Sequence, residues 1–232
     1  MYVNGIWVRA CSLMSADILR KCRVPPLPLK TPRATEKRRH PQRRPEVGGG
    51  MTTVIDQLQI DHGNMRQLLR ILDDETKLYG AGGIPDFDLM KEVIEYALNY
   101  PTLIHHPREE LLFRRLLDRD PTSESTIGDL IGEHAELAQL AQRFAGAVHN
   151  VTQDVELPRA WFDTLARDYI AMTRHHMDAE EQRFFPRLLE KLQDCDWAEF
   201  ESRPTAGSDP LFGSSIEKHQ LNLHRRLLQM TR

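Results

Sequence analysis

Hydrophobic residues recur with helical spacing in the first regular stretch of the chain, which begins near residue 54. Leucines and a methionine follow one another at intervals of three, four or seven residues: Leu58, Met65, Leu68, Leu69 and Leu72. Such intervals place these side chains on one face of an α-helix. The glycines and the proline within residues 80–85 are of the kind that end helices. The pattern therefore predicts a long amphipathic helix that ends near residue 80.

Three more stretches show this kind of pattern, at about residues 87–117, 126–148 and 159–192. Short polar connections separate them, and runs of alternating β-branched residues, which are typical of strands, are absent from the sequence. Four long amphipathic helices joined by short loops predict an all-α fold, an up-down-up-down four-helix bundle over residues 51–193.

The residues after the fourth stretch, 194–232, are expected to form a separate helical extension. Trp197 and Phe200 predict a short docked turn or helix, and the Asp-Pro-Leu-Phe-Gly sequence at 209–213 predicts a turn with apolar anchors. A final helix is expected over residues 215–230, lying against the bundle. Its apolar residues fall on one side: Ile216, Leu223, Leu227 and Met230.

The charges are distributed unevenly along the chain. The formal net charge is −3, but residues 1–50 hold eleven Lys or Arg and three Asp or Glu, so this segment carries +8 and the rest carries −11. Residues 24–50 are rich in proline and basic residues, which predicts a disordered arm. Our interpretation is that Met51 is the true start and that residues 1–50 are an over-extension. Nucleic-acid binding through this arm is the weaker interpretation.

Composition excludes several classes of protein. No apolar run approaches the roughly 20 residues that a membrane-spanning helix needs. The three cysteines do not form a disulfide framework, and none belongs to a Cys-x-x-Cys pair. The simplest interpretation is a reduced, cytoplasmic protein that does not cross a membrane.

Histidines and carboxylates repeat along the four predicted helices. The doublets Asp61-His62 and Glu133-His134 lie on the first and third helices. A His-x-x-x-Glu spacing follows on the second and fourth helices, as His105 with Glu109 and as His176 with Glu180. The offset between these two pairs is the same for the histidines as for the glutamates, and it is nearly the offset between the two doublets. The nearly constant offset indicates two related helix pairs.

This spacing favours metal binding. Residues i and i+4 lie on one helix face, so a histidine and a glutamate placed this way can bind one ion, or the carboxylate can bridge two ions. Imidazoles combined with bridging carboxylates suit first-row metals such as iron or manganese, and a site without cysteine argues against structural zinc. The four histidines and two glutamates together predict a two-ion site in the bundle core.

Two different His-Glu pairs of the second helix could supply its metal ligands. Both His105 with Glu109 and His106 with Glu110 fit the spacing; the repeat offset favours the first pair, and the second is the alternative. The remaining neighbours could orient the ligands or could simply be solvated: His106, His175, Glu110 and Glu181. The two prolines of this stretch, at 101 and 107, predict either a bent helix or two helices that each begin near a proline.

At these residues the sequence resembles the hemerythrin-like, HHE cation-binding family. The likeness covers about residues 54–192, and the Asp-Pro-Leu-Phe-Gly stretch resembles a tail seen in bacterial members. It implies a four-helix bundle around a non-haem centre of two iron ions. Carried over residue by residue, it makes the following the metal ligands: His62, His105, Glu109, His134, His176 and Glu180.

The sequence departs from the oxygen-carrying hemerythrins, which have a fifth histidine and a late aspartate. Its four-histidine, two-glutamate set is more similar to bacterial di-iron proteins associated with iron–sulfur repair and nitrosative stress. The resemblance implies a protein that binds or senses oxygen, nitric oxide or iron. The alternative is an oxidoreductase or iron donor that acts on peroxide or nitric oxide, or in iron-centre repair.

Overall fold

The computed structural model describes residues 53–202, 209–212 and 221–230, all of which belong to the compact unit Gly48–Arg232. The predicted arm at 1–50, the proposed start at Met51 and the first part of the last predicted helix, 215–220, lie outside the described residues.

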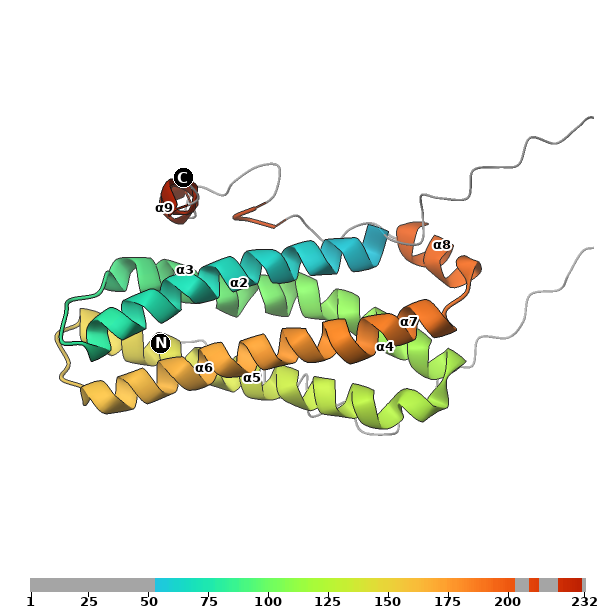
Figure 1. Cartoon of the computed structure of the whole chain (residues 1–232), viewed down its shortest axis with the longest axis horizontal. Coiled ribbons are helices and arrows are strands. Elements are labelled where there is room, and N and C mark those ends of the chain that lie inside the picture. Colours follow the sequence, from blue (N-terminus) through green and yellow to red (C-terminus); the bar gives the residue numbers. More distant parts are fainter. Residues whose placement is uncertain (1–52, 203–208, 213–220, 231–232) are drawn as a thin grey trace, which may run out of the picture. The chain divides into compact units, whose positions relative to one another are not determined.

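Helices dominate the described part of the chain, where there is no strand, as the sequence predicted. Figure 1 shows the long helices packed side by side. In chain order the elements are α2 (Thr53–Gly80), α3 (Phe87–Tyr100), the π turn η1 (Pro101–His105), α4 (His106–Arg119), the 3₁₀ turn η2 (Pro121–Ser123), α5 (Glu124–Thr152), α6 (Arg159–Ala179), the π turn η3 (Glu180–Phe184), α7 (Phe185–Lys191), α8 (Asp194–Ser202) and α9 (Leu221–Met230).

The long helices form a bundle in which α2 packs against α3 and α6, and α5 packs against α3 and α6. Local signals in the sequence set where these helices begin and end. Gly82 has a φ of +88°, a conformation that favours glycine, in the connection after α2. The Asp86 side chain then accepts a hydrogen bond of 2.9 Å from the backbone N–H of Leu89 and caps α3. No described helix is both long enough and apolar enough to span a membrane.

The prolines of the second helical stretch are accommodated by a π turn. α3, η1 and α4 follow one another without a break, and the backbone N–H of His106 bonds to the carbonyl of Pro101, five residues back. A second π turn, η3, lies between α6 and α7, where the N–H of Phe185 bonds to the carbonyl of Glu180. The sequence left open a bent helix or two helices that each begin near a proline, and the structure has one unbroken helical run that contains a π turn rather than two separated helices. π turns of this kind often mark functional sites.

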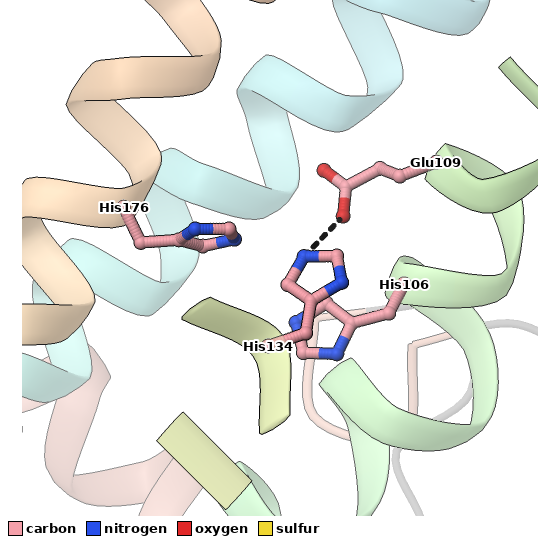
Figure 2. Close-up of side chains that lie close together, drawn as sticks. All are labelled: His106, Glu109, His134 and His176. Carbon is pink, nitrogen blue, oxygen red and sulfur yellow. Dashed lines mark ion pairs between the residues drawn. The ribbon is translucent and has the colours of Figure 1, made fainter. Parts of the chain in front are cut away.

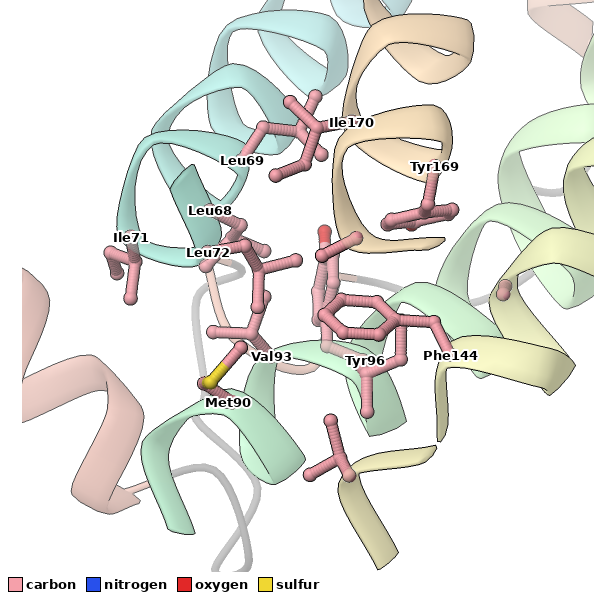
Figure 3. Packing of buried hydrophobic residues seen from close by; sticks show 14 of the residues in the cluster. Leu68, Leu69, Ile71, Leu72, Met90, Val93, Tyr96, Phe144, Tyr169 and Ile170 are labelled. Carbon is pink, nitrogen blue, oxygen red and sulfur yellow. The ribbon is translucent and has the colours of Figure 1, made fainter. Parts of the chain in front are cut away.

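Buried apolar side chains form two separate clusters along the bundle. The larger cluster includes Leu72, Met90, Tyr96 and Phe144, and Figure 3 shows part of it. The smaller cluster lies toward the α8 end and includes Phe113. On the first three long helical runs, the predicted metal-binding residues fall in sequence between the residues of these two clusters, and on the fourth His176 and Glu180 lie where the two clusters meet. The fold therefore places a polar layer between two apolar regions.

The extension packs against both clusters. Trp197 of α8 is buried in the smaller cluster, and Leu223 and Leu227 of α9 are buried in the larger one. The hydroxyl of Tyr96 on α3 donates a hydrogen bond of 2.8 Å to Asp209. This contact ties the Asp209–Phe212 segment to the bundle wall.

Candidate metal centre

The structure brings all six predicted ligands together in the polar layer. They come from every long helical run: His62 from α2, His105 from η1, Glu109 from α4, His134 from α5, His176 from α6 and Glu180 from η3. Five of these residues are buried, and the His134 side chain is 11% exposed. The two π turns each carry one member of the set, so the irregular backbone lies directly at the site.

Each glutamate faces histidines of both helix pairs. Glu109 Oε1 lies 3.0 Å from Nε2 of His105, while Oε2 lies 3.4 Å from Nε2 of His134. Glu180 Oε2 lies 3.3 Å from Nε2 of His62, and Oε1 lies 3.4 Å from Nε2 of His176. Each carboxylate therefore presents one oxygen to each half of the layer, which is the placement that a bridging ligand needs.

Two groups of side chains have ligand atoms close enough to surround a cation. One group is His62, His105, Glu109 and Glu180, and all four residues are buried. The other is His106, Glu109, His134 and His176, of which His106 and His134 are partly exposed (Figure 2). Within each group the ligand atoms lie within 4.8 Å of one another. We call these the buried group and the partly exposed group; Glu109 belongs to both.

A second set of carboxylates orients three of the histidines. Asp61 Oδ2 lies 3.2 Å from Nδ1 of His105, Glu133 Oε2 lies 2.7 Å from Nδ1 of His176, and Glu181 Oε1 lies 2.9 Å from Nδ1 of His62. A carboxylate on Nδ1 fixes the ring orientation and leaves Nε2 toward the site. This set consists of Asp61, Glu133 and Glu181.

Asp61 and Glu133 are functional candidates whose roles sequence reasoning missed. Each precedes a lone histidine in its doublet, yet its carboxylate contacts the histidine of a different helix. The signal was present in the sequence, because the offset from Asp61 to Glu133 is nearly the same as the offset from His105 to His176, the histidines that they contact. The internal repeat thus extends beyond the ligands.

The other neighbours named from the sequence lie in different surroundings. Glu110 is half-buried and its Oε2 lies 3.5 Å from Nη2 of Arg114, so Glu110 does not face the layer together with His106. The His175 side chain is 70% exposed, and its Nε2 lies 3.9 Å from Glu133. His106 does reach the layer, as part of the partly exposed group.

The electrostatics of the layer match a site for cations. Burial alone would lower the pKa of His62, but the carboxylates of Glu109, Glu180 and Glu181 outweigh it and raise this pKa to about 11. The same balance raises the pKa values of His105 and His134 to about 9. Burial would raise the pKa of Glu109, but the histidines around it lower it well below its usual range. In the metal-free protein, the carboxylates therefore stabilise the protonated, positively charged forms of these histidines.

Unpartnered polar atoms point to the same conclusion. Both carboxylate oxygens of Glu109 and of Glu180 are buried without a hydrogen-bond partner among the described residues, as are Nε2 of His134 and of His176. Buried polar atoms are normally satisfied, so such a concentration needs an explanation. Two bound first-row cations would coordinate all six atoms, and the donor set fits iron.

Fold and site together define a helical-bundle protein with a metal-binding layer of histidine and glutamate. Comparison with family models gives the same class: residues 53–188 match the model described as the hemerythrin HHE cation-binding domain. The chain therefore belongs to this family, as the motifs predicted. Comparison with curated proteins and with solved structures finds no match.

Proposed function

We propose that this protein holds two iron ions in the polar layer and uses them to bind or sense a small diatomic molecule such as oxygen or nitric oxide. The observation that carries this proposal is the placement of Glu109 and Glu180, each with one oxygen toward each half of the layer. Shared carboxylates of this kind are suited to a pair of ions rather than to one.

In this proposal each helix pair supplies the histidines for one ion. His62 and His105 hold the ion of the buried group, and His134 and His176 hold the ion of the partly exposed group. We also infer that the long helical runs alternate up and down, which puts both histidine pairs at the same level. Each ion then has two imidazoles and two carboxylate oxygens, fewer ligands than iron ordinarily takes.

The remaining coordination positions suit a small ligand. Bound iron would supply reversible coordination and one-electron redox chemistry. The protein supplies an apolar wall on the side of the smaller cluster: the Phe185 ring stacks on His62 at 5.6 Å, and the Phe113 ring lies 6.0 Å from that of His134. These rings keep bulk water away from the layer, which strengthens the electrostatic interactions within it.

A second candidate function is turnover of peroxide or nitric oxide, or donation of iron to other iron centres. The partial exposure of His106 and His134 favours this second function, because an ion held beside them has a shorter route to solvent, and so to a substrate or an iron acceptor, than an ion in the buried group. A binder and a donor differ in whether iron leaves the protein under working conditions.

Metal analysis of the protein produced in iron-rich medium tests the proposal. We expect about two irons per chain and optical absorption from a bridged iron pair. Spectral shifts with oxygen or nitric oxide but no turnover would identify a binder, and consumption of peroxide or nitric oxide would identify an enzyme. A folded, iron-free protein would refute the site.

A further inference from the structure

The rings of His106 and His134 stack face to face in the partly exposed group. Their centroids lie 3.8 Å apart, and their planes differ by only 14° (Figure 2). By contrast, the rings of His134 and His176 meet nearly edge to face, at 4.6 Å and 71°. The rings of His106 and His176 are therefore oriented very differently relative to the ring of His134.

Stacked imidazoles cannot both bind one ion in this arrangement. A metal ion lies in the plane of its imidazole ligand, about 2 Å from the nitrogen. Two nearly parallel rings whose centroids are 3.8 Å apart have planes that do not meet within that distance of both rings. The inclined rings of His134 and His176 do allow a shared ion. While His134 holds the ion, His106 therefore covers His134 rather than joining it as a ligand.

His106 also has no counterpart in the other half of the repeat. The offset that relates His105 to His176 and Glu109 to Glu180 relates His106 to Met177. Met177 is buried in the larger apolar cluster and offers no comparable ligand. An extra histidine has thus been placed only beside the group that is partly open to solvent.

We propose that His106 is the entry ligand of the partly exposed group. Its imidazole captures an incoming divalent cation at the solvent side, passes it to His134 and His176, and returns to stack on His134. Release follows the same route in reverse. This inference rests on the proposed metal site, and it adds how an ion reaches and leaves that site.

An entry ligand makes a kinetic prediction that a permanent ligand does not. A residue that contacts the ion only in transit lowers the barrier in both directions, so its loss slows loading and release by the same factor and leaves the dissociation constant unchanged. We expect His106→Phe, which keeps a stacking ring without ligand nitrogens, to slow both steps for one ion about tenfold, or about 1.4 kcal/mol of barrier.

The experiment uses the whole chain and ferrous iron without oxygen, with stopped-flow loading and with release to a chelator. His175→Phe is the matched control, since His175 is also one histidine of an adjacent pair but its side chain is 70% exposed. We expect this control to load and release at wild-type rates. His106→Gln, which restores an oxygen ligand, should recover part of the rate. Circular dichroism checks that each variant is folded.

Each other outcome overturns the inference in a recognisable way. If His106→Phe binds one iron where the wild type binds two, His106 is a permanent ligand. If His106→Phe loads and releases iron at wild-type rates, the stack is packing only. If the wild-type protein itself binds no iron, the proposed function fails, and the entry route fails with it.

Discussion

The buried group and the partly exposed group are built from the same materials but are held differently. The buried group draws its histidines from two helical runs and the partly exposed group from three. Both groups share Glu109, and in each group at least one histidine has a carboxylate on Nδ1. In the buried group, however, His62 and His105 are both oriented by carboxylates. In the partly exposed group, His176 has such a partner, whereas His134 has the His106 ring stacked on it.

The difference can be traced to one position of the repeat, which is Glu181 in one half and Glu110 in the other. Glu181 orients His62 and is itself held by Arg66, whose Nη1 lies 2.7 Å from Oε1 of Glu181. The residue that corresponds to Glu181 in the other half of the repeat is Glu110, whose side chain is 42% exposed and pairs with Arg114 instead. The histidine His62 is therefore held by a carboxylate that is itself held by an arginine, whereas Glu110 provides no such support in the other half of the repeat. We therefore expect one tightly held ion and one exchangeable ion.

The largest effect should come from the carboxylate that both groups share. Glu109→Ala removes a ligand of each ion, so iron content should fall from about two per chain to well below one, with helix content nearly retained. Metal analysis and circular dichroism measure the two quantities. Glu110→Ala is the matched control and should keep its iron. Loss of only one iron in Glu109→Ala would show that the two groups do not share this residue.

The orienting carboxylates should separate the two groups. Asp61→Asn removes the charge beside His105 and should weaken the ion of the buried group. Glu133→Gln should weaken the ion of the partly exposed group through His176. Loss of such partners typically costs about 10–100-fold in affinity. Titration with ferrous iron resolves the two ions. Equal weakening of both ions by both variants would contradict the separation.

The acid–base behaviour should also differ between the groups. Metal binding needs neutral imidazoles, so protons compete with it. The pKa is raised to about 11 for His62 and about 9 for His105 in the buried group, and to about 9 for His134 in the other. Affinity should therefore rise with pH for both ions, by up to about tenfold per unit for each proton displaced. The buried group should need the higher pH for loading. Calorimetric titrations between about pH 6 and pH 9 check this order.

The same pKa shifts predict how the metal-free protein responds to pH. A raised histidine pKa stabilises the folded state fully below the ordinary value near 6.5, and this contribution is lost as pH rises through the folded-state pKa. The melting temperature of the metal-free protein should therefore fall as pH rises from about 6.5 toward about 9. A melting temperature that rises over this window would contradict the raised pKa values.

The smallest effect is expected at Tyr100, which is one step further from the ion. Burial and the negative charge of Asp61 raise the pKa of the Tyr100 hydroxyl, and the Asp61 carboxylate orients His105. Tyr100→Phe removes a polar neighbour of this carboxylate and should weaken only the ion of the buried group, by a few-fold, which is on the order of 1 kcal/mol or less. Tyr169→Phe, another buried tyrosine of the larger cluster, is the control. An effect of Tyr100→Phe on both ions would indicate a general loss of packing.

Much of the fold and the core of the candidate site could be predicted from the sequence. Helical spacing located the long helices, and the i, i+4 pairs with the constant offset located six residues that the structure brings together. This works because a helix face and a repeat are properties of sequence spacing alone. Glu109 could be preferred over Glu110 for the same reason, because the repeat offset relates Glu109 to Glu180 and His105 to His176.

What could not be predicted depends on backbone that departs from the regular helix. In a regular α-helix, successive residues point about 100° apart, so only one of His105 and His106 should face the layer. The π turn η1 ends at this doublet, and both histidines belong to candidate ligand groups. The roles of Asp61 and Glu133 were missed because their carboxylates contact histidines of other helices. Spacing within one helix does not report such a contact, and only the offset between the two halves of the repeat carries a signal for it.

The placement of Glu109 and Glu180, each facing histidines of both helix pairs, has a consequence for how such a protein can arise. Each helix pair carries two of the layer's histidines and a glutamate that faces histidines of both pairs, so in the proposed centre a single pair is incomplete and a second copy of itself could complete it. A short hairpin gene could therefore have produced a working symmetric dimer before duplication and fusion joined the halves. Once they were joined, each half could diverge on its own, and His106 and Glu181 stand at positions where the two halves now differ in role.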